Sequence, residues 1–462
     1  MQPQTLLLIL AFLCVAAYRF GRQRSLATAG GERPSASLHS LPSYYGYFTA
    51  IWVLLPGLAI ILLWISLEPR VITAVMMERL PESVRSLAPG ALDLAINDIR
   101  NLAAGDVVSA RVDPAMQAAA DFYIQTRAKS RLLLSVFVLA AAVAGGVLAW
   151  RRIGPQFRAR NHVEGVVQIA LLAASTIAIL TTVGIVLSVL FESILFFRKV
   201  PITEFLFGLE WSPQTAIRAD QVGSSGAFGA VPLFTGTLLI TAIAMFVAVP
   251  IGLMTAIYLA EYARPSFRAI AKPLLEVLAG IPTVVYGFFA ALTVAPLIRS
   301  AGTQLGLDVA SESALAAGLV MGIMIIPLVS SLSDDAITAV PRAMRDGSFG
   351  LGATRSETVK LVILPAALPG IVGGVLLAVS RAIGETMIVV MAAGLAANLT
   401  ANPLEAVTTV TVQIVTLLVG DQEFDSAKTL AAFALGLVLF IVTLGLNVIG
   451  LRVVRKYREQ YE

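Results

Sequence analysis

Residues 340–371 read VPRAMRDGSFGLGATRSETVKLVILPAALPGI, a polar stretch between two long apolar runs. The stretch opens with Val-Pro, and Pro341 suits the first turn of a helix. A short helix of mixed polar and apolar residues is predicted over 341–352, with a break at Gly350 and Gly352. The chain then returns to apolar sequence through LPAALPG. Because loops between packed helices usually have about 2–8 residues, this loop is long enough to present a docking element.

The composition around this loop is that of an integral membrane protein. Of the 462 residues, 57% are hydrophobic and 13% are charged, whereas a soluble globular chain has about 25% charged residues. A transmembrane helix needs about 20 apolar residues. The sequence therefore predicts an all-α fold with about nine transmembrane helices, at roughly 4–20, 45–67, 131–150, 164–192, 233–260, 273–298, 313–333, 367–394 and 429–451.

Clusters of Arg and Lys predict the orientation of the chain, because cytoplasmic loops carry an excess of these residues. The clusters follow the first, third and fifth runs and recur in the tail RVVRKYREQYE. They place the N-terminus outside and the C-terminus in the cytoplasm. The first run lacks a basic start and a small-residue cleavage site, so it is interpreted as an anchor. Residues 68–130 then lie outside, and GALDLAINDIRNL (90–102) predicts helix there.

Several kinds of site are excluded or disfavoured by the residues that the chain contains. One cysteine, Cys14, rules out a disulfide within the chain, and two histidines, His39 and His162, leave little for a metal site. Neither a GxxxxGK[ST] phosphate loop nor an HExxH or GxSxG motif occurs. The net charge of +4 is spread over short clusters, which does not indicate nucleic-acid binding. We therefore expect no catalytic residue and no cofactor in this chain.

The 340–371 loop resembles the cytoplasmic EAA loop of bacterial ABC-importer permeases. The spacing is an acidic and two small residues, three residues, Gly, nine residues, then aliphatic-x-Leu-Pro, at Asp346, Gly347, Ser348, Gly352, Val362, Leu364 and Pro365. Asp stands where the family has Glu, and Gly-Ser stands for Ala-Ala, which weakens the helix by about 1 kcal/mol at Gly347. The resemblance implies that the short helix docks on a separate ATPase and that Gly352 turns the chain back to the membrane.

Four further stretches resemble the PstC-type permeases of phosphate ABC importers. They are FGAVPLFTGTLLITAIAMFVAVPIGLMTAIYLAEYA (228–263), LEVLAGIPTVVYGFFA (275–290), SRAIGETMIVV (380–390) and NPLEAVTTVTVQIV (402–415). The resemblance covers about residues 164–462 and implies a six-helix type I ABC-importer permease core with its coupling loop at 334–366. Residues 1–163 would form an N-terminal extension with three transmembrane helices and the extracytoplasmic segment at 68–130.

The resemblance also implies a function and partners. The chain would be a permease subunit of a phosphate importer in the bacterial inner membrane, surrounded by membrane lipid. Its partners would be a homologous second permease, two ATPase subunits that bind ATP and Mg, and an extracytoplasmic phosphate-binding protein. Sulfate, molybdate or phosphonate remain open as substrates. A secondary transporter would need inverted repeats, which the sequence does not show, and a phosphate-sensing scaffold would leave the coupling loop without a role.

The stretch SRAIGET places Arg381 and Glu385 one helical turn apart in the eighth run. Two unpaired charges near the membrane centre cost roughly 5–7 kcal/mol, so such residues face a bundle interior or a water-filled cavity. Two interpretations are open. Arg381 and Glu385 satisfy each other or a facing helix, or Arg381 lines the translocation pathway and attracts an oxyanion through its planar guanidinium while Glu385 holds its rotamer.

Two further features concern the ends and bends of the predicted helices. Gly280, Pro282 and Gly287 interrupt the sixth run, and Pro removes a backbone hydrogen bond, so a kink is predicted there. Asp334 and Asp335 close the seventh run and are predicted to be solvated.

Overall fold

The computed structural model describes residues 3–29, 38–78, 80, 85, 89–105, 114–213, 226–419 and 426–458. By its internal contacts the chain forms two compact units, Met1–Leu180 and Thr181–Glu462. The division falls within one long helix, α6 (Ala159–Phe197). The predicted all-α fold is confirmed, because the strands found in the described ranges are only β1 (Trp211–Ser212) and β2 (Ala227–Phe228), a short antiparallel ladder.

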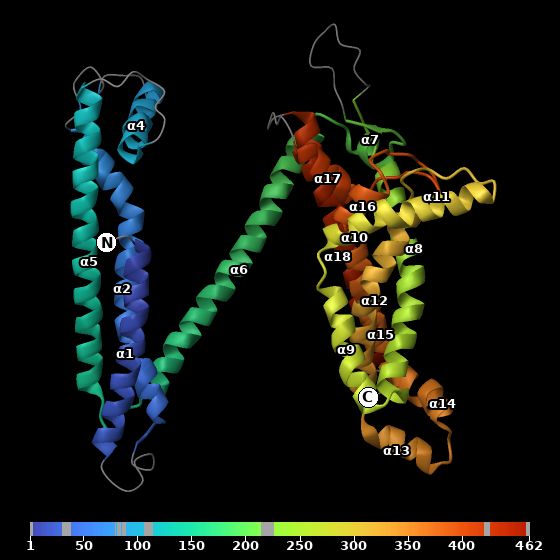
Figure 1. The fold of residues 1–462 in the computed structure, drawn as a ribbon, viewed down its shortest axis with the longest axis horizontal. Helices are drawn as coiled ribbons and strands as arrows, with labels where there is room; N and C mark the ends of the chain where they lie inside the picture. The colour runs from blue at the N-terminus through green and yellow to red at the C-terminus, as the bar shows by residue number, and fades with distance from the viewer. Residues whose placement is uncertain are drawn as a thin grey trace. The chain divides into compact units, whose positions relative to one another are not determined.

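Three long helices form the N-terminal unit (Figure 1): α1 (Pro3–Ala29), α2 (Pro42–Met77) and α5 (Pro114–Arg152). Their apolar contacts gather in two clusters, one around Leu6, Leu10 and Val138 and one around Tyr45, Phe48 and Ala149. A shorter helix, α4 (Pro89–Ala104), packs on α2 and α5 through Met76, Ile96, Ile99 and Ala120. The predicted helix over 90–102 is therefore present as part of α4.

The C-terminal unit is organised around α12 (Ala314–Thr338), whose residues are mostly buried. This helix packs against α8 (Val231–Ile257), α9 (Pro265–Ala279), α15 (Leu364–Ile383) and α16 (Met387–Ala392). Ala and Val dominate the shared core, so the helices approach closely. The other elements of this unit, with η for a π-helical segment, are α7 (Ile202–Phe207), η2 (Tyr258–Tyr262), α10 (Thr283–Phe289), η3 (Ala290–Val294), α11 (Ala295–Gln304), α13 (Arg342–Gly350), α14 (Arg355–Thr358), η4 (Val359–Ile363), α17 (Val410–Leu418) and α18 (Ala427–Arg458).

The two ends of the C-terminal unit differ in what they carry (Figure 1). At one end α7, the strand ladder and α17 pack through an aromatic cluster of Phe196, Phe205, Trp211 and Phe228. At the other end lie α13, α14 and the end of α18. This places the loop around α13 on the same side of the unit as the C-terminal end of α18. That arrangement agrees with the cytoplasmic side predicted for the tail from its charges and implied for the loop by its resemblance to the EAA loop.

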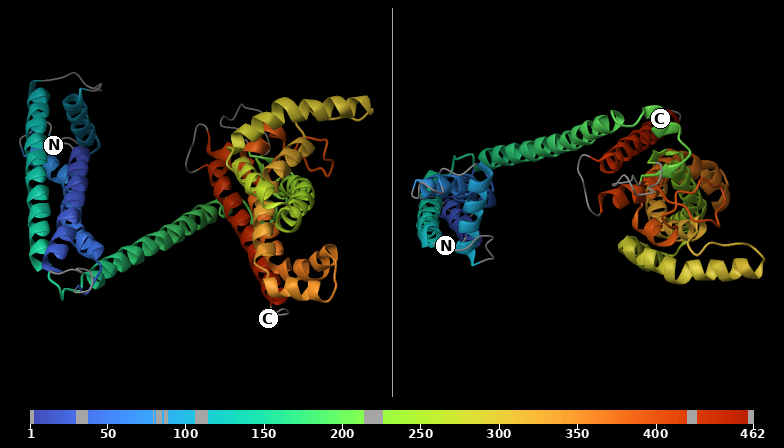
Figure 2. Two further views of the ribbon diagram at one scale, coloured as in Figure 1. Left: turned by 60° about the horizontal axis from the view of Figure 1, so that its bottom comes forward. Right: turned by 90° about the horizontal axis from the view of Figure 1, so that it is seen from above.

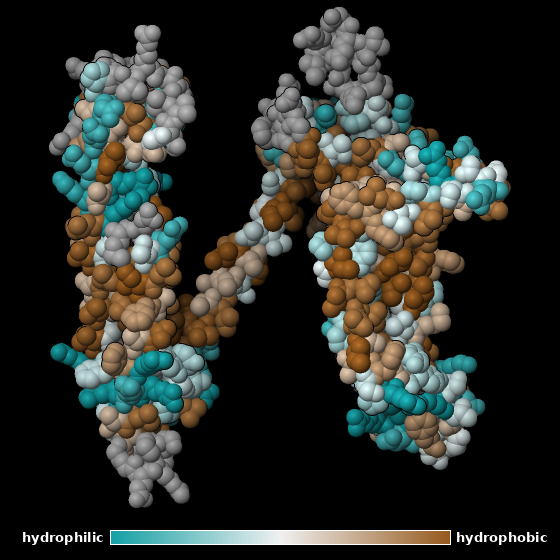
Figure 3. Space-filling view, in the orientation of Figure 1, coloured by the Kyte–Doolittle hydropathy of each residue, from teal (hydrophilic) through white to brown (hydrophobic). Residues whose placement is uncertain are grey.

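Nine helices in the described residues are long and apolar enough to cross a membrane, as the sequence predicts. Each unit shows an apolar band across the middle of its helices, with hydrophilic residues toward the ends (Figure 3). The candidate spans are Gln4–Ala29, Pro42–Met77, Met116–Arg152, Ala159–Phe197, Val231–Tyr262, Thr283–Gln304, Ala314–Thr338, Arg355–Ile383 and Ala427–Arg452.

The sixth predicted span, 273–298, is not one helix in the structure. Helix α9 ends at Ala279, and α10 begins at Thr283 after the extended Pro282. This break is the predicted interruption at Gly280 and Pro282. A hydrogen bond spans it, because the Tyr286 hydroxyl donates to the backbone carbonyl of Leu278 at 3.0 Å. Beyond η3, α11 extends away from the other helices of the unit in all views (yellow in Figures 1 and 2).

Candidate functional site

The short helix predicted over 341–352 is present as α13, and it lies on the surface. The helix begins after the extended Pro341 and contains no buried residue. It ends at Gly350, and the chain reverses at Gly352, whose φ of 85° lies in the left-handed region that favours glycine. The break predicted at Gly350 and Gly352 is therefore confirmed.

The three residues at the acidic-small-small positions lie on α13 with different surroundings. Asp346 and Gly347 are exposed, and a Cβ added at Gly347 would meet no atom within 4 Å. The Ser348 hydroxyl instead lies 2.9 Å from the Thr358 hydroxyl of α14. The helix therefore has one face fixed to its own unit and one face of small and charged residues open to a partner.

Leu364 and Pro365 form the first turn of α15, directly after η4. Leu364 packs at the edge of an apolar cluster, which includes Ile337, Val340, Val359 and Ile363. The helix runs without a break from Arg355 to Ile383. The Leu-Pro pair therefore lies inside a continuous helix that leads from the surface loop into the apolar band.

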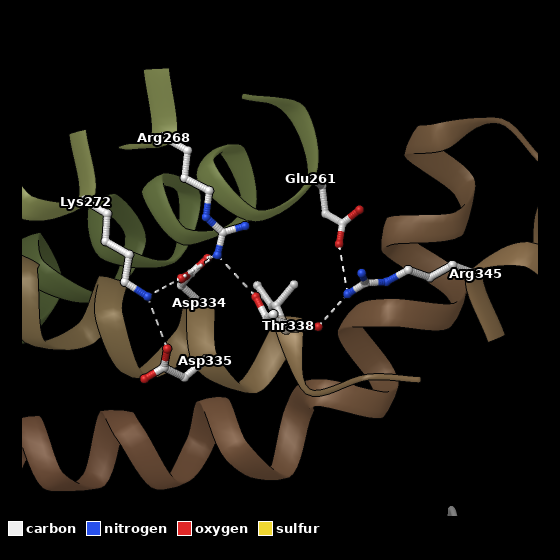
Figure 4. Close-up of polar contacts among 8 residues, drawn as sticks. Glu261, Arg268, Lys272, Asp334, Asp335, Thr338 and Arg345 are labelled. Carbon is white, nitrogen blue, oxygen red and sulfur yellow. Dashed lines mark hydrogen bonds and ion pairs between the residues drawn. The ribbon is translucent and has the colours of Figure 1, made fainter. Parts of the chain in front are cut away.

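Arg345 anchors α13 to the rest of the unit (Figure 4). One nitrogen of its guanidinium donates to the carbonyl oxygen of Ile337, in the last turn of α12, at 2.6 Å. The same nitrogen forms an ion pair with the Glu261 carboxylate of η2 at 3.1 Å, without the geometry of a hydrogen bond. Both side chains are largely buried, 20% and 10% exposed. Displacement of α13 therefore acts on α12 and on the end of α8 together.

A second set of charges joins α9 to α12, and it is named here the α9–α12 ion cluster: Arg268, Lys272, Asp334 and Asp335. One Arg268 nitrogen lies 2.9 Å from each Asp334 carboxylate oxygen, and the Lys272 ammonium lies 2.8 Å from one of them (Figure 4). Lys272 also contacts Asp335 at 3.3 Å. Two cations and two carboxylates balance in charge, so the cluster ties the two helices together without net charge.

The prediction that Asp334 is solvated is wrong. Asp334 is 2% exposed, whereas the Asp335 side chain is 65% exposed. Arg268 and Lys272 stand four residues apart on α9, which puts both on one helix face, opposite Asp334. That spacing indicates in the sequence that the two cations lie together, but it does not identify the carboxylate that they bind. Asp334 is 66 residues from Arg268 and 62 residues from Lys272 along the chain.

The prediction that one helix over 367–394 holds Arg381 and Glu385 one helical turn apart is also wrong. Helix α15 ends at Ile383, with Gly384 as its cap, and α16 begins at Met387. Arg381 lies in the last turn of α15 and is exposed, where a cation also suits the helix dipole. Among the described residues it makes no ion pair with Glu385 or any other carboxylate.

Glu385 lies buried in the break between α15 and α16. Its carboxylate accepts a hydrogen bond from the backbone N–H of Met387 at 3.1 Å. The backbone carbonyl oxygen of Glu385 accepts a hydrogen bond from the Thr411 hydroxyl of α17 at 2.9 Å. The side chain thus satisfies a free N–H at the start of α16. The interpretation in which Glu385 pairs with Arg381 has no support from these contacts.

The two broken helices of the unit meet at Gly287. A Cβ added to Gly287 of α10 would lie 2.7 Å from the Met391 sulfur and 3.1 Å from the Met387 carbonyl oxygen, both in α16. The glycine is therefore required for the close packing of α10 on α16. Discontinuous helices in transporters often frame the substrate site, and here Arg381 and Glu385 border one of the two breaks.

The described ranges hold no group of three His, Cys, Asp or Glu residues that suits a metal ion. Arg299 and Glu312 were not singled out from the sequence, yet they line a cavity of about 300 Å³ with Met391 and Ala392 of α16. Glu261 and Arg345, which join α13 to the unit, and Arg268 and Lys272 of the α9–α12 ion cluster were also missed as contact residues. Their charges are visible in the sequence, but their pairing depends on the tertiary fold.

Comparison with known proteins places both parts of the chain. Residues 248–459 match the family described as "Binding-protein-dependent transport system inner membrane component", and residues 7–181 match one described as "Phosphate ATP-binding cassette transporter". The chain is 32% identical over 243 residues to the probable ABC transporter permease protein YqgH of Bacillus subtilis, covering 52% of this chain and 74% of that protein.

Two further similarities were found. The chain is 32% identical over 277 residues to the phosphate transport system permease protein PstC 1 of Mycobacterium tuberculosis, covering 54% of this chain and 81% of that protein. It is 15% identical, with a TM-score of 0.45, to a chain of a bacterial alginate ABC transporter in complex with an alginate-bound periplasmic protein, covering 65% of this chain and 97% of that one. By the family match and the two sequence relatives, the chain belongs to the binding-protein-dependent transport system inner membrane components and is a multi-pass permease subunit of an ABC importer.

Proposed function

We propose that this chain is the PstC-type permease of an ATP-driven phosphate importer in the bacterial inner membrane. One observation supports phosphate as the substrate: the family that matches residues 7–181 and the Mycobacterium tuberculosis relative, aligned over 277 residues, both have descriptions that name phosphate. The proposed partners are a second permease, two ATPase subunits that bind ATP and Mg, and an extracytoplasmic phosphate-binding protein. The function thus concerns transport, and hydrolysis of ATP belongs to the partner ATPases.

The surface helix α13 is the proposed contact with the ATPase. Its open face holds the exposed Asp346 and Gly347, and the glycine lets another surface approach closely. The exposed Leu351 beyond it adds apolar area for a partner to cover. Its other face is held by Arg345 and Ser348. A displacement of α13 by the ATPase is therefore transmitted to the C-terminal unit through these two side chains.

A continuous series of contacts leads from α13 to the proposed pathway. Arg345 joins α13 to η2 and α12, and Asp334 joins α12 to α9. Helix α9 continues past the break at Pro282 into α10, which packs on α16 through Gly287. Helix α16 starts at the break that Arg381 and Glu385 border. Motion of the ATPase would thus reach the two residues through packed helices and ion pairs.

Arg381 is the proposed pathway residue, and Glu385 is the residue that shapes its surroundings. The exposed guanidinium has no carboxylate partner among the described residues, so its N–H donors are available to the oxygens of a passing anion. Glu385 fixes the start of α16 by accepting the Met387 N–H, at the break that follows Arg381.

The test is uptake by proteoliposomes that hold this chain, its partner permease and the ATPase, with the phosphate-binding protein outside and ATP inside. We expect uptake of labelled phosphate that unlabelled phosphate suppresses and a tenfold excess of sulfate or molybdate does not. Uptake of labelled sulfate or molybdate in place of phosphate would assign the chain to another oxyanion. Phosphate uptake that does not depend on internal ATP would reject the importer function itself.

A further inference from the structure

An apolar groove of about 490 Å³ lies in the N-terminal unit between α1, α2 and α5. Small side chains at Ala16, Ala17 and Gly146 leave the space, and Phe20 and Trp150 border one end of it. The Thr49 hydroxyl in its lining already donates to the Ala17 carbonyl oxygen at 2.7 Å. All three helices are candidate membrane spans, so an apolar chain could lie in this groove at the level of the hydrocarbon.

The end of the groove at Phe20 and Trp150 carries positive charge. One turn beyond Phe20, the Arg24 guanidinium lies over the Trp150 ring, 4.5 Å from its centroid. Helix α5 ends with Arg151 and Arg152 in its last turn, and Arg152 lies over the Trp52 ring, 5.7 Å from its centroid. Within the described ranges none of these three arginines forms an ion pair. The buried Nε of Arg24 also has no hydrogen-bond partner there, so the end of the groove at Trp150 carries a cation without an ion-pair partner.

The stacking on Trp150 is what makes Arg24 suited to a phosphate. A guanidinium over an aromatic face is held in place by the cation–π attraction, and the N–H donors at its edge stay free for oxygens. An arginine edge matches phosphate oxygens in pairs. The ends of α1 and α5 are predicted to be cytoplasmic, and anionic lipids concentrate in the cytoplasmic leaflet, where each nearby Arg or Lys adds about 1 kcal/mol of attraction.

We propose that this groove binds an anionic phospholipid, with an acyl chain between α1, α2 and α5 and the phosphate on Arg24. Apolar space alone would not select a lipid, because lipid tails and side chains are equally apolar. The selection comes from charge: the apolar groove in the bundle leads to Arg24, which forms no ion pair in the described ranges, and basic pockets between such helices bind lipid headgroups. A phosphatidylglycerol therefore fits both ends, whereas a phosphatidylcholine of equal chains brings a quaternary ammonium beside the arginine, which offsets the attraction of its phosphate.

Native mass spectrometry of the purified full-length chain tests the site with two probes of identical acyl chains, phosphatidylglycerol and phosphatidylcholine. We expect phosphatidylglycerol to bind about tenfold more tightly. Arg24→Gln is expected to remove this preference and leave phosphatidylcholine binding unchanged, and Arg24→Lys to restore part of it. The matched control is Arg22→Gln, since Arg22 is exposed on the same helix and does not contact Trp150. Equal binding of both lipids to the wild-type chain would overturn the proposal, as would an equal effect of the two Gln variants.

The apolar end has its own pair of variants. Val147→Trp fills the groove from α5, whereas Leu148→Trp adds the same bulk at an exposed neighbour outside its lining. We expect Val147→Trp alone to weaken phosphatidylglycerol binding about tenfold, with both variants eluting as the wild-type chain does. The same measurement on the complex with the partner permease and ATPase separates lipid from protein. If the assembled complex retains no phosphatidylglycerol and Val147→Trp prevents assembly, the groove holds a protein helix and the proposal fails.

Discussion

Removal of the buried carboxylate of Asp334 is expected to destabilise the C-terminal unit far more than removal of its neighbour. Asp334 is 2% exposed and holds Arg268 and Lys272 at 2.8–2.9 Å. Breaking one partner out of a buried pair costs about 3–5 kcal/mol because the remaining charge is left uncompensated. Arg268 and Lys272 are each 31% exposed and regain part of their hydration. We therefore expect the lower bound, about 3 kcal/mol, for Asp334→Ala.

Asp335→Ala provides the matched control. The Asp335 side chain is 65% exposed and makes a single contact, 3.3 Å to the same Lys272. Exposed ion pairs contribute about 0–1 kcal/mol. A domain near 250 residues loses about 2 °C of unfolding temperature per kcal/mol, so Asp334→Ala should lower it by about 6 °C and Asp335→Ala by less than about 2 °C.

The assay is thermal unfolding of the purified chain in detergent, followed by the fraction that still elutes as a single peak after heating. A third variant, with Arg268→Met, Lys272→Met and Asp334→Leu, should recover most of the loss, because apolar side chains of similar volume often replace a buried ion cluster without cost. Equal shifts for Asp334→Ala and Asp335→Ala would refute the assignment of Asp334 as the buried centre of the cluster.

Three further predictions concern the loop, the pathway and the topology. Gly352→Val should insert normally but abolish stimulation of ATP hydrolysis by the binding protein, because a branched side chain at a φ of 85° costs about 1–2 kcal/mol and misplaces α13; normal stimulation in an assembled complex would contradict this. Arg381→Lys should slow phosphate uptake and Arg381→Ala should stop it, and adding Glu385→Ala should not restore it because the two side chains are not paired; near-normal uptake by the double variant would reject the pathway role. In a chain without its native cysteine, a cysteine at the exposed Asn97 of α4 should react with an impermeant maleimide in intact cells, and one at the exposed Gln23 of α1 should not; equal labelling would overturn the predicted orientation.

The sequence was a good guide to elements whose signals are local. Apolar runs of about 20 residues locate spans because the bilayer sets their length. Pro341 and Gly352 predict the start and end of α13 because each restricts or frees its own backbone. Gly280 and Pro282 predict the break before α10 for the same reason. None of these predictions requires knowledge of the tertiary contacts of the residues involved.

The errors concern residues whose state depends on tertiary contacts or on a break that the apolar run does not show. A continuous apolar run over 367–394 suggests one helix, but Glu385 is fixed by the Met387 N–H and by Thr411, 26 residues further along the chain. Asp334 is buried only because α9 brings two cations to it. Arg345 reads as an ordinary surface arginine until Glu261 of η2 is placed beside it. Side-chain pairing between helices therefore could not be predicted from the sequence.

The π-helical segments η3 and η4 lie inside helices that continue on both sides. Such a segment holds one residue more than the α-helical path requires, so it is an insertion that the helix has absorbed. Deleting one residue there converts it to regular helix and leaves the faces before and after it in register. Deletion of a residue elsewhere in the same helix rotates everything beyond it by about 100°. We therefore expect α10–α11 and α14–α15 to accept the loss of one residue at these two segments without repacking of the helices that they join.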